Sequence, residues 1–293
     1  MTTTRKLIMV LALMCLSMGN VLSQNLDSWP KTVLITNDDG INDPKMIGLA
    51  KAFSKVAETY VVAPSGDKSG TTHYTSVFSI YQLTVEKKNI GEGIKAYAVD
   101  GYPGDCVLLA LQGIMKDTKP DLVISGINGG PNLGYDWLAS GTIGAARLAS
   151  YWGVPSIAVS GIKDGLPETE EALINWVIEF SKSDLVRQLK TGQYFTLSFP
   201  RLSLSEIKGI KVAARAGILA DFSFSKIQSD SAESNKEVWQ LNRPKPITDV
   251  DAESDAALYY SGYIIVVPML ADEIDYPLLS KLKNNSGLLP EWK

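Results

Sequence analysis

The stretch Val33-Leu-Ile-Thr-Asn-Asp-Asp-Gly-Ile-Asn-Asp-Pro44 decides the fold. It begins as a short apolar, β-branched run, typical of a buried strand, and continues into two adjacent acids, Asp38 and Asp39. A helix start follows, with Asp43 as the N-cap and Pro44 in the first helical position. Such a strand places both acids at the carboxyl edge of a sheet, where open α/β sheets bind ligands. Adjacent carboxylates repel each other unless a cation lies between them, so we expect a divalent metal site. The alternative is that the two acids only cap the helix and bind backbone amides.

Predicted strands and helices alternate over the first two thirds of the chain. We expect strands at 31–36, 59–63, 121–125 and 155–160, two shorter ones at 79–85 and 95–99, and helices at 44–55, 105–116, 141–152 and 168–189. This alternation predicts an α/β fold with a mostly parallel, doubly wound sheet and helices on both faces.

The last third of the chain has a different pattern. Strands are expected at 194–199, 209–214 and 263–267, an edge strand at 237–242, and a serine- and charge-rich loop at 221–235. Strands without intervening helices predict a C-terminal hairpin that protrudes from the α/β body. No linker composition marks a boundary, so residues 31–293 are expected to form one continuous domain. Within it, residues 31–190 form the core, and residues 191–293 supply C-terminal strands and an extension for oligomer formation.

The N-terminus has the layout of a secretory signal peptide. Arg5 and Lys6 precede an apolar run at 7–18, and Ser23 offers a cleavage point, so residues 1–23 are expected to be removed on export to the periplasm or the medium. An uncleaved anchor is the alternative. The cleaved chain would keep Cys106 as its remaining cysteine, which leaves no internal disulfide, and would have no membrane segment. The net charge of −4 weakly disfavours a nucleic-acid duplex as partner.

Three predicted strands end at the same edge of the sheet with candidate metal ligands. The first ends in Asp38 and Asp39, the second leads into a loop with Ser69, and the third leads into the polar segment 126–134. Carboxylate, hydroxyl and amide oxygens suit Mg²⁺ or Mn²⁺. The single histidine, His73, lacks the partners for a zinc site and fits either acid–base catalysis or plain hydrogen bonding.

A second candidate feature is the start of the helix predicted at 141–152. Ser140, Gly141 and Thr142 are small or hydroxylated residues that leave backbone N–H groups accessible to an anion such as phosphate. The alternative is that Ser140 acts as an ordinary N-cap.

Taken together, these motifs resemble the SurE family of metal-dependent nucleotidases and acid phosphatases. The resemblance runs from about residue 33 to residue 160 and returns at 248–252 and 262–268. It rests on Thr36-Asn-Asp-Asp-Gly40, Ala63-Pro64, Ser69-Gly70, Gly101-Tyr-Pro-Gly-Asp-Cys-Val107, Ser125-Gly-Ile-Asn-Gly-Gly-Pro-Asn-Leu-Gly134 and Ser140-Gly-Thr142. Tyr102, where a threonine is usual, and Ala139, where a tyrosine is usual, depart from the family pattern.

The resemblance implies a Rossmann-like core and hydrolysis of nucleoside 5′- or 3′-monophosphates. It also implies one divalent metal ion, Mg²⁺ or Mn²⁺, and assembly into a homodimer or homotetramer. By position, Asp38, Asp39, Ser69 and Asn128 match the family's metal ligands, and Asn132, Ser140, Gly141 and Thr142 lie near the phosphate.

We expect Asp38 or Asp39 to accept a proton from the attacking water, with a preference for Asp38. Two other functions stay open at this point. One is a broad-specificity exported acid phosphatase or polyphosphatase acting on other phosphomonoesters, and the other is a nucleotide- or metal-binding module without catalysis.

Overall fold

The computed structural model describes residues 29–162, 165–227, 237–247 and 249–284. Within these residues, the main sheet has nine strands in the order β3-β4-β2-β1-β5-β6-β7-β13-β8. The strands are β1 (Thr32–Thr36), β2 (Glu58–Pro64), β3 (Val85–Lys88), β4 (Ile94–Val99), β5 (Leu122–Asn128), β6 (Ser156–Ser160), β7 (Gln193–Ser198), β8 (Ile210–Val212) and β13 (Ile264–Leu270). All neighbouring pairs are parallel except β3–β4 and β13–β7. The predicted α/β fold with a mostly parallel sheet is confirmed.

Helices cover both faces of this sheet, as expected. The helices are α2 (Pro44–Phe53), α3 (Pro103–Leu109), α4 (Gly141–Tyr151), α5 (Pro167–Ser181), α6 (Asp184–Arg187), α7 (Asp255–Tyr260) and α8 (Tyr276–Asn284). Successive side chains of a strand point to opposite faces. Val33 and Ile35 of β1 therefore pack with α2 and α5, and Leu34 packs on the other face with α3 and α4.

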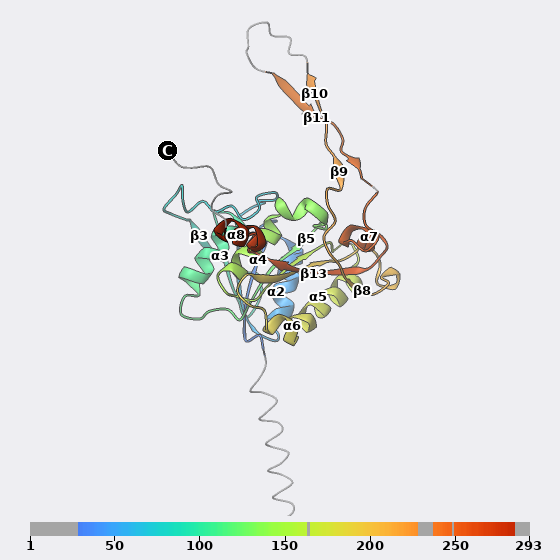
Figure 1. The fold of residues 1–293 in the computed structure, drawn as a ribbon. Helices are drawn as coiled ribbons and strands as arrows, with labels where there is room; N and C mark the ends of the chain where they lie inside the picture. Colours follow the sequence, from blue (N-terminus) through green and yellow to red (C-terminus); the bar gives the residue numbers. More distant parts are fainter. Residues whose placement is uncertain (1–28, 163–164, 228–236, 248, 285–293) are drawn as a thin grey trace, which may run out of the picture.

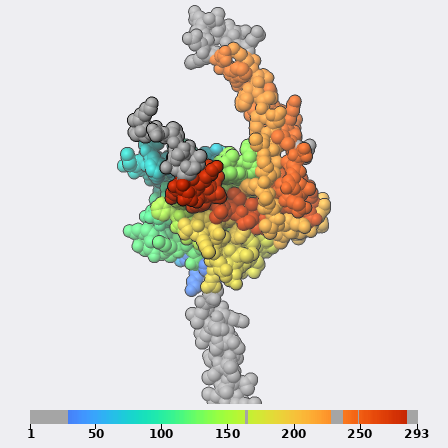
Figure 2. All heavy atoms as spheres, viewed as in Figure 1, coloured from blue at the N-terminus to red at the C-terminus, as the bar shows by residue number. Residues whose placement is uncertain are grey.

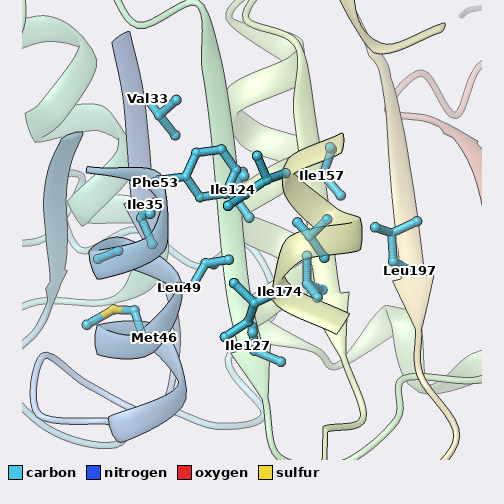
Figure 3. Packing of buried hydrophobic residues seen from close by; sticks show 14 of the residues in the cluster. Val33, Ile35, Met46, Leu49, Phe53, Ile124, Ile127, Ile157, Ile174 and Leu197 are labelled. Carbon is cyan, nitrogen blue, oxygen red and sulfur yellow. The ribbon is translucent and has the colours of Figure 1, made fainter. Parts of the chain in front are cut away.

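The larger core cluster lies between the sheet and helices α2 and α5 (Figure 3). Phe53 and Leu49 of α2 are fully buried there, and Ile174 of α5 packs in the same cluster. The alternation of apolar residues in β1 and the helical spacing in α2 produce two matching apolar surfaces. Their burial fixes the position of the β1–α2 turn, which carries Asp38 and Asp39.

Part of the C-terminal third forms an arm that stands out from the body (Figures 1 and 2). It contains β9 (Ala220–Asp221), β10 (Phe224–Ile227), β11 (Val238–Leu241) and β12 (Lys245–Pro246). Strand β10 pairs antiparallel with β11, and β9 pairs antiparallel with β12. Every residue of β10 and β11 is exposed. The predicted protruding hairpin is confirmed.

The structure corrects several element boundaries. The segment 221–235 was expected to be a loop, yet residues 224–227 form β10, because Phe224 and Ile227 find a pairing partner in β11 that lies outside the local sequence window. The strand expected at 79–85 is wrong for residues 79–84, which form no strand; β3 begins at Val85 and runs to Lys88. The helix expected at 168–189 is broken after Ser181 into α5 and α6.

Strands β7, β8 and β13 belong to the main sheet, which therefore continues past residue 190. Helices α7 and α8 were not expected from the sequence. In the part of the chain that the structure describes, no helix is long and apolar enough to span a membrane. The signal peptide predicted at residues 1–23 lies outside the described residues.

Candidate metal and phosphate site

The candidate site lies where the order of the strands reverses. From β1, the chain places β2 and β4 on one side, while β5, β6 and β7 follow on the other side. In open α/β sheets the crevice at such a switch point binds ligands. Asp38 and Asp39 follow β1, and Asn128 ends β5, whose Ser125 is the register partner of Thr36. The topology thus brings these residues to one edge, as the sequence predicted.

Asp38 is buried and closely surrounded, with only 3% of its surface exposed. Its Oδ1 accepts a 2.5 Å hydrogen bond from the Thr142 hydroxyl, and its carbonyl oxygen accepts one of 2.7 Å from the Lys68 N–H. A Cβ added to Gly141 would lie 2.8 Å from the Asp38 Cβ, so only glycine permits this approach of α4. Burial raises the pKa of Asp38, and the Thr142 bond opposes that rise.

Asp39 has a free oxygen. Its Oδ2 is buried and has no hydrogen-bond partner among the described residues. Burial, followed by the charge of Asp38, raises the pKa of Asp39 to about 6, and Lys45 acts in the opposite direction. The hydroxyls of Thr36, the last residue of β1, and of its register partner Ser125 in β5 are likewise buried without a partner within the described ranges. Such groups normally contact an ion or an ordered water.

Ser69 lies in the loop after β2, on the exposed side of the site. Its hydroxyl and its N–H both donate to Asp67 Oδ1, at 2.6 Å and 2.8 Å. The neighbouring Lys68 N–H anchors this loop on Asp38. Asp67, whose charge raises the pKa of both Asp38 and Asp39, was not predicted from the sequence. The Asp-x-Ser spacing of a local turn is the signal that would have pointed to it.

Asn128 and Asn132 both lie in the predicted glycine-rich segment. The Asn128 amide nitrogen donates to the Gly130 carbonyl at 2.8 Å, which leaves the amide oxygen, the atom that a hard cation takes, outside that bond. The Asn132 amide nitrogen donates to the Ser160 hydroxyl at 2.8 Å. Both asparagines are therefore held on the ends of β5 and β6.

Ser140 caps α4, as the more conservative prediction stated. Its Oγ accepts a 3.1 Å hydrogen bond from the Ile143 N–H, and its own hydroxyl proton stays available for an acceptor. Gly141 and Thr142 follow in the first turn, directly against Asp38. The start of α4 and the two acids therefore form a single site.

Two residues from the C-terminal third fix the segment 126–134. The Arg215 guanidinium donates to the Asn132 carbonyl at 3.1 Å, and Asp255 Oδ2 accepts from the Gly134 N–H at 3.0 Å. Arg215 and Asp255 also form a buried ion pair of 3.6 Å. Nothing in the local sequence of Arg215 predicted this role. Asp255 lies three residues beyond the segment 248–252, where the resemblance to the SurE family returns. Residue 248 of that segment is outside the described residues.

His73 lies in the loop after β2 and contacts Arg147 of α4. Its imidazole contacts Arg147 and the Thr72 hydroxyl, and it lines a cavity of about 490 Å³ with residues 271–274. Burial and the charge of Arg147 lower the pKa of His73, which favours the neutral imidazole at pH 7. Of the two predicted roles, these contacts favour hydrogen bonding.

The donors at the site fit a hard divalent cation. They are two carboxylates, one hydroxyl and one amide oxygen, a set typical of Mg²⁺ or Mn²⁺. Among the described residues, no group of three or more histidine, cysteine, aspartate or glutamate side chains is placed to hold a metal. The unpartnered Asp39 Oδ2 is the structural observation that supports the fit.

Known proteins resemble this chain over most of its length. The family model described as "Survival protein SurE" matches residues 33–218. A protein named 5′-nucleotidase SurE from Clostridium beijerinckii is 37% identical over 254 residues, 85% of this chain and 96% of that protein. 5′-Nucleotidase SurE 1 from Burkholderia lata is 33% identical over 87% of this chain and 96% of its own length. The crystal structure of the SurE protein from Aquifex aeolicus superposes with a TM-score of 0.72 at 28% identity, covering 87% of this chain and 99% of that one. The chain therefore belongs to the SurE family.

Proposed function

We propose that this chain is a divalent-metal-dependent phosphomonoesterase that hydrolyses nucleoside 5′-monophosphates and, as further substrates, 3′-monophosphates. The observation that carries the proposal is the hydrogen bond between Thr142 and Asp38. It joins the carboxylate pair to the start of α4, so that a cation and a phosphate would bind side by side. The names of the relatives, 5′-nucleotidase SurE, support the nucleotide part of the proposal.

Asp38, Asp39, Ser69 and Asn128 would hold one Mg²⁺ or Mn²⁺ ion. When bound, such an ion polarises phosphoryl oxygens and lowers the pKa of a water. Ser69 donates its hydroxyl proton to Asp67 at 2.6 Å, which leaves the lone pairs of its oxygen for the ion. Asp38 keeps Oδ2 for the ion, because Oδ1 is bonded to Thr142.

The first turn of α4 would bind the phosphate. Its backbone N–H groups and the Ser140 hydroxyl stabilise the negative charge that develops on the phosphoryl oxygens. Asn132, held by its bond to Ser160, would add an amide contact near the same phosphate. Because Gly141 packs against Asp38, the phosphate is kept next to the carboxylates.

The structure changes which acid we favour as the proton acceptor. The sequence led to a preference for Asp38, but its Oδ1 is already bonded to Thr142. In Asp39, which is less buried than Asp38, the unpartnered Oδ2 would hold the ion and the second carboxylate oxygen would accept the proton of the attacking water. We therefore assign proton acceptance to Asp39.

A phosphate-release assay on the purified mature protein tests the proposal. The assay compares nucleoside 5′- and 3′-monophosphates with sugar phosphates and polyphosphate, in Mg²⁺, in Mn²⁺ and in EDTA. We expect turnover of nucleotides with metal and none in EDTA. Equal turnover of all substrates would favour a broad acid phosphatase or polyphosphatase instead. Tight nucleotide binding without phosphate release would favour a non-catalytic module.

Export and assembly are also proposals. The signal-peptide pattern in residues 1–23 supports export, and N-terminal sequencing of the mature protein after Ser23 would test it. The arm supports a homodimer or homotetramer, because β10 and β11 leave the large apolar residues Phe224, Trp239 and Leu241 exposed. Such exposed apolar surface is typical of a contact with another chain. Light scattering of the intact chain and of an arm-deleted chain would test that role.

A further inference from the structure

A small aromatic cluster lies on one side of the candidate site. The Tyr74 and Tyr102 rings meet edge to face, with their centroids 4.6 Å apart and an angle of 83°. The Lys68 ammonium lies over the Tyr102 ring at 5.0 Å from its centroid. Tyr74 is 46% exposed, and Lys68 and Tyr102 are partly exposed. We call these three residues the tyrosine cluster.

The tyrosine cluster lies at the same sheet edge as the two acids. Tyr102 follows β4, which is separated from β1 by β2 alone in the sheet order. Two strand spacings amount to about 10 Å, which is the scale of a nucleoside monophosphate. Lys68 connects the two places directly, because its N–H donates to the Asp38 carbonyl at 2.7 Å while its side chain reaches the Tyr102 ring.

We propose that the tyrosine cluster binds the base of the nucleotide, an inference that rests on the proposed function. Aromatic rings bind nucleobases by stacking, and they tolerate different bases because each base has a π face. Purines offer the larger face, so purine nucleoside monophosphates are the preferred substrates. The base displaces the Lys68 ammonium from the ring, and the ammonium then pairs with the phosphate, which is its stronger electrostatic partner.

A competing location exists on the other side of the site. Pro131, Arg201 and Tyr260 contribute to the lining of a cavity of about 360 Å³ next to the segment 126–134. Tyr260 is 76% exposed and meets Tyr259 edge to face, so it resembles Tyr74 in chemistry and exposure. We favour the tyrosine cluster because Lys68 links it to Asp38 through a backbone hydrogen bond.

The test compares AMP with ribose 5-phosphate, which has the same phosphate and sugar but no base. For wild type, Tyr102→Thr, Tyr74→Leu and Tyr260→Thr, the kcat/KM for AMP is divided by that for ribose 5-phosphate. We expect this ratio to fall about tenfold in Tyr102→Thr and in Tyr74→Leu, through a higher KM for AMP. Tyr102→Phe, which keeps the ring, should retain the wild-type ratio, and Tyr260→Thr should do the same.

Other results would overturn the inference. If the ratio of the two kcat/KM values falls in Tyr260→Thr and is unchanged in Tyr102→Thr and Tyr74→Leu, the base binds in the cavity at Pro131. A parallel loss for both substrates in Tyr102→Thr and Tyr74→Leu shows that the cluster only supports the fold. If the wild type hydrolyses neither substrate, the proposed function fails, and calorimetric binding of AMP and ribose 5-phosphate to the same variants decides on the base site independently.

Discussion

The Thr142 hydroxyl donates a 2.5 Å hydrogen bond to Oδ1 of Asp38, and this bond joins the first turn of α4 to the end of β1. The two residues are 104 positions apart in the chain. Both are buried, so the bond forms in a place that water does not reach freely. It therefore orients one oxygen of the carboxylate and leaves the other for a ligand.

Replacing Thr142 with valine removes this donor and nearly preserves the shape of the side chain. We expect the free energy of unfolding to fall by about 1–3 kcal/mol, since a buried carboxylate oxygen loses its partner. Phosphatase turnover should fall about tenfold or more as Asp38 loses its orientation. Urea denaturation and steady-state kinetics measure both effects. Thr142→Ser, which retains the hydroxyl, is the control, and equal losses in both variants would contradict this explanation.

Asp38→Asn and Asp39→Asn should each abolish phosphatase turnover and retain the fold. The substitution removes a negative charge that balances the cation, and a neutral amide does not accept the proton of water. In EDTA, Asp39→Asn should melt at a higher temperature than the wild type at pH 8, because the repulsion between the two acids is removed. Added Mn²⁺ should stabilise the wild type and have little effect on either variant. Wild-type-like turnover in both variants would disprove the mechanism.

The metal-free protein should lose stability as the pH rises from about 4 to about 6. Burial and the charge of Asp38 raise the pKa of Asp39 to about 6, so the folded state holds a proton that the unfolded state has already released. The stabilisation from this proton is fully present below the pKa of Asp39 in the unfolded state and is lost as the pH rises past its pKa in the folded state. For this half-buried group, the expected loss is about 1–2 kcal/mol after allowance for solvent screening. Urea denaturation in EDTA at several pH values measures it. The slope should be smaller in Asp39→Asn, where the contribution of Asp38, whose pKa burial also raises, remains.

Gly144 in α4 supports the loop that carries Ser69. A Cβ added at Gly144 would lie 2.1 Å from the Thr72 carbonyl oxygen, so the loop must move if alanine is placed there. We expect Gly144→Ala to destabilise the protein by about 1–3 kcal/mol and to reduce turnover. Gly48 in α2 is the matched control, because a Cβ there would make ordinary contacts at 3.4 Å and 3.6 Å. Gly48→Ala should be neutral or stabilising. Equal effects of the two substitutions in thermal denaturation would refute the steric argument.

The ion pair between Arg215 and Asp255 should be coupled to the site. Asp255→Ala leaves Arg215 buried without its charge partner, and we expect a loss of about 3–5 kcal/mol in the free energy of unfolding. The double variant Asp255→Ala with Arg215→Met should be more stable than Asp255→Ala alone, because the unpaired charge is gone. Both variants should lower turnover, since the Gly134 N–H loses its partner in each and the Asn132 carbonyl also loses Arg215 in the double variant. Strictly additive stability losses would show that the pair is not coupled.

The sequence allowed prediction of the sheet class and of the main elements of the site. Periodic apolar residues located β1, α2, β5, α4 and β6 to within a few residues. The resemblance to SurE placed Ser69 and Asn128 near the two acids. The single helix expected at 168–189 is wrong, because the chain breaks after Ser181 into α5 and α6. The arm was only partly predicted, because β10 and β11 pair with each other across a gap in the chain and have no buried face that would produce a strong apolar pattern.

The sequence by itself determined that two acids end the first strand and that a small-residue helix start at Ser140 is available for an anion. These features depend on neighbouring residues, so a short stretch of chain is enough to specify them. Only the tertiary structure decided that Thr142 occupies Asp38 Oδ1, that Asp39 Oδ2 stays unpartnered, and that Asp255 holds Gly134. These contacts join residues more than 100 positions apart, and they follow from the packing of α4 and of the C-terminal third on the sheet, which no local pattern encodes.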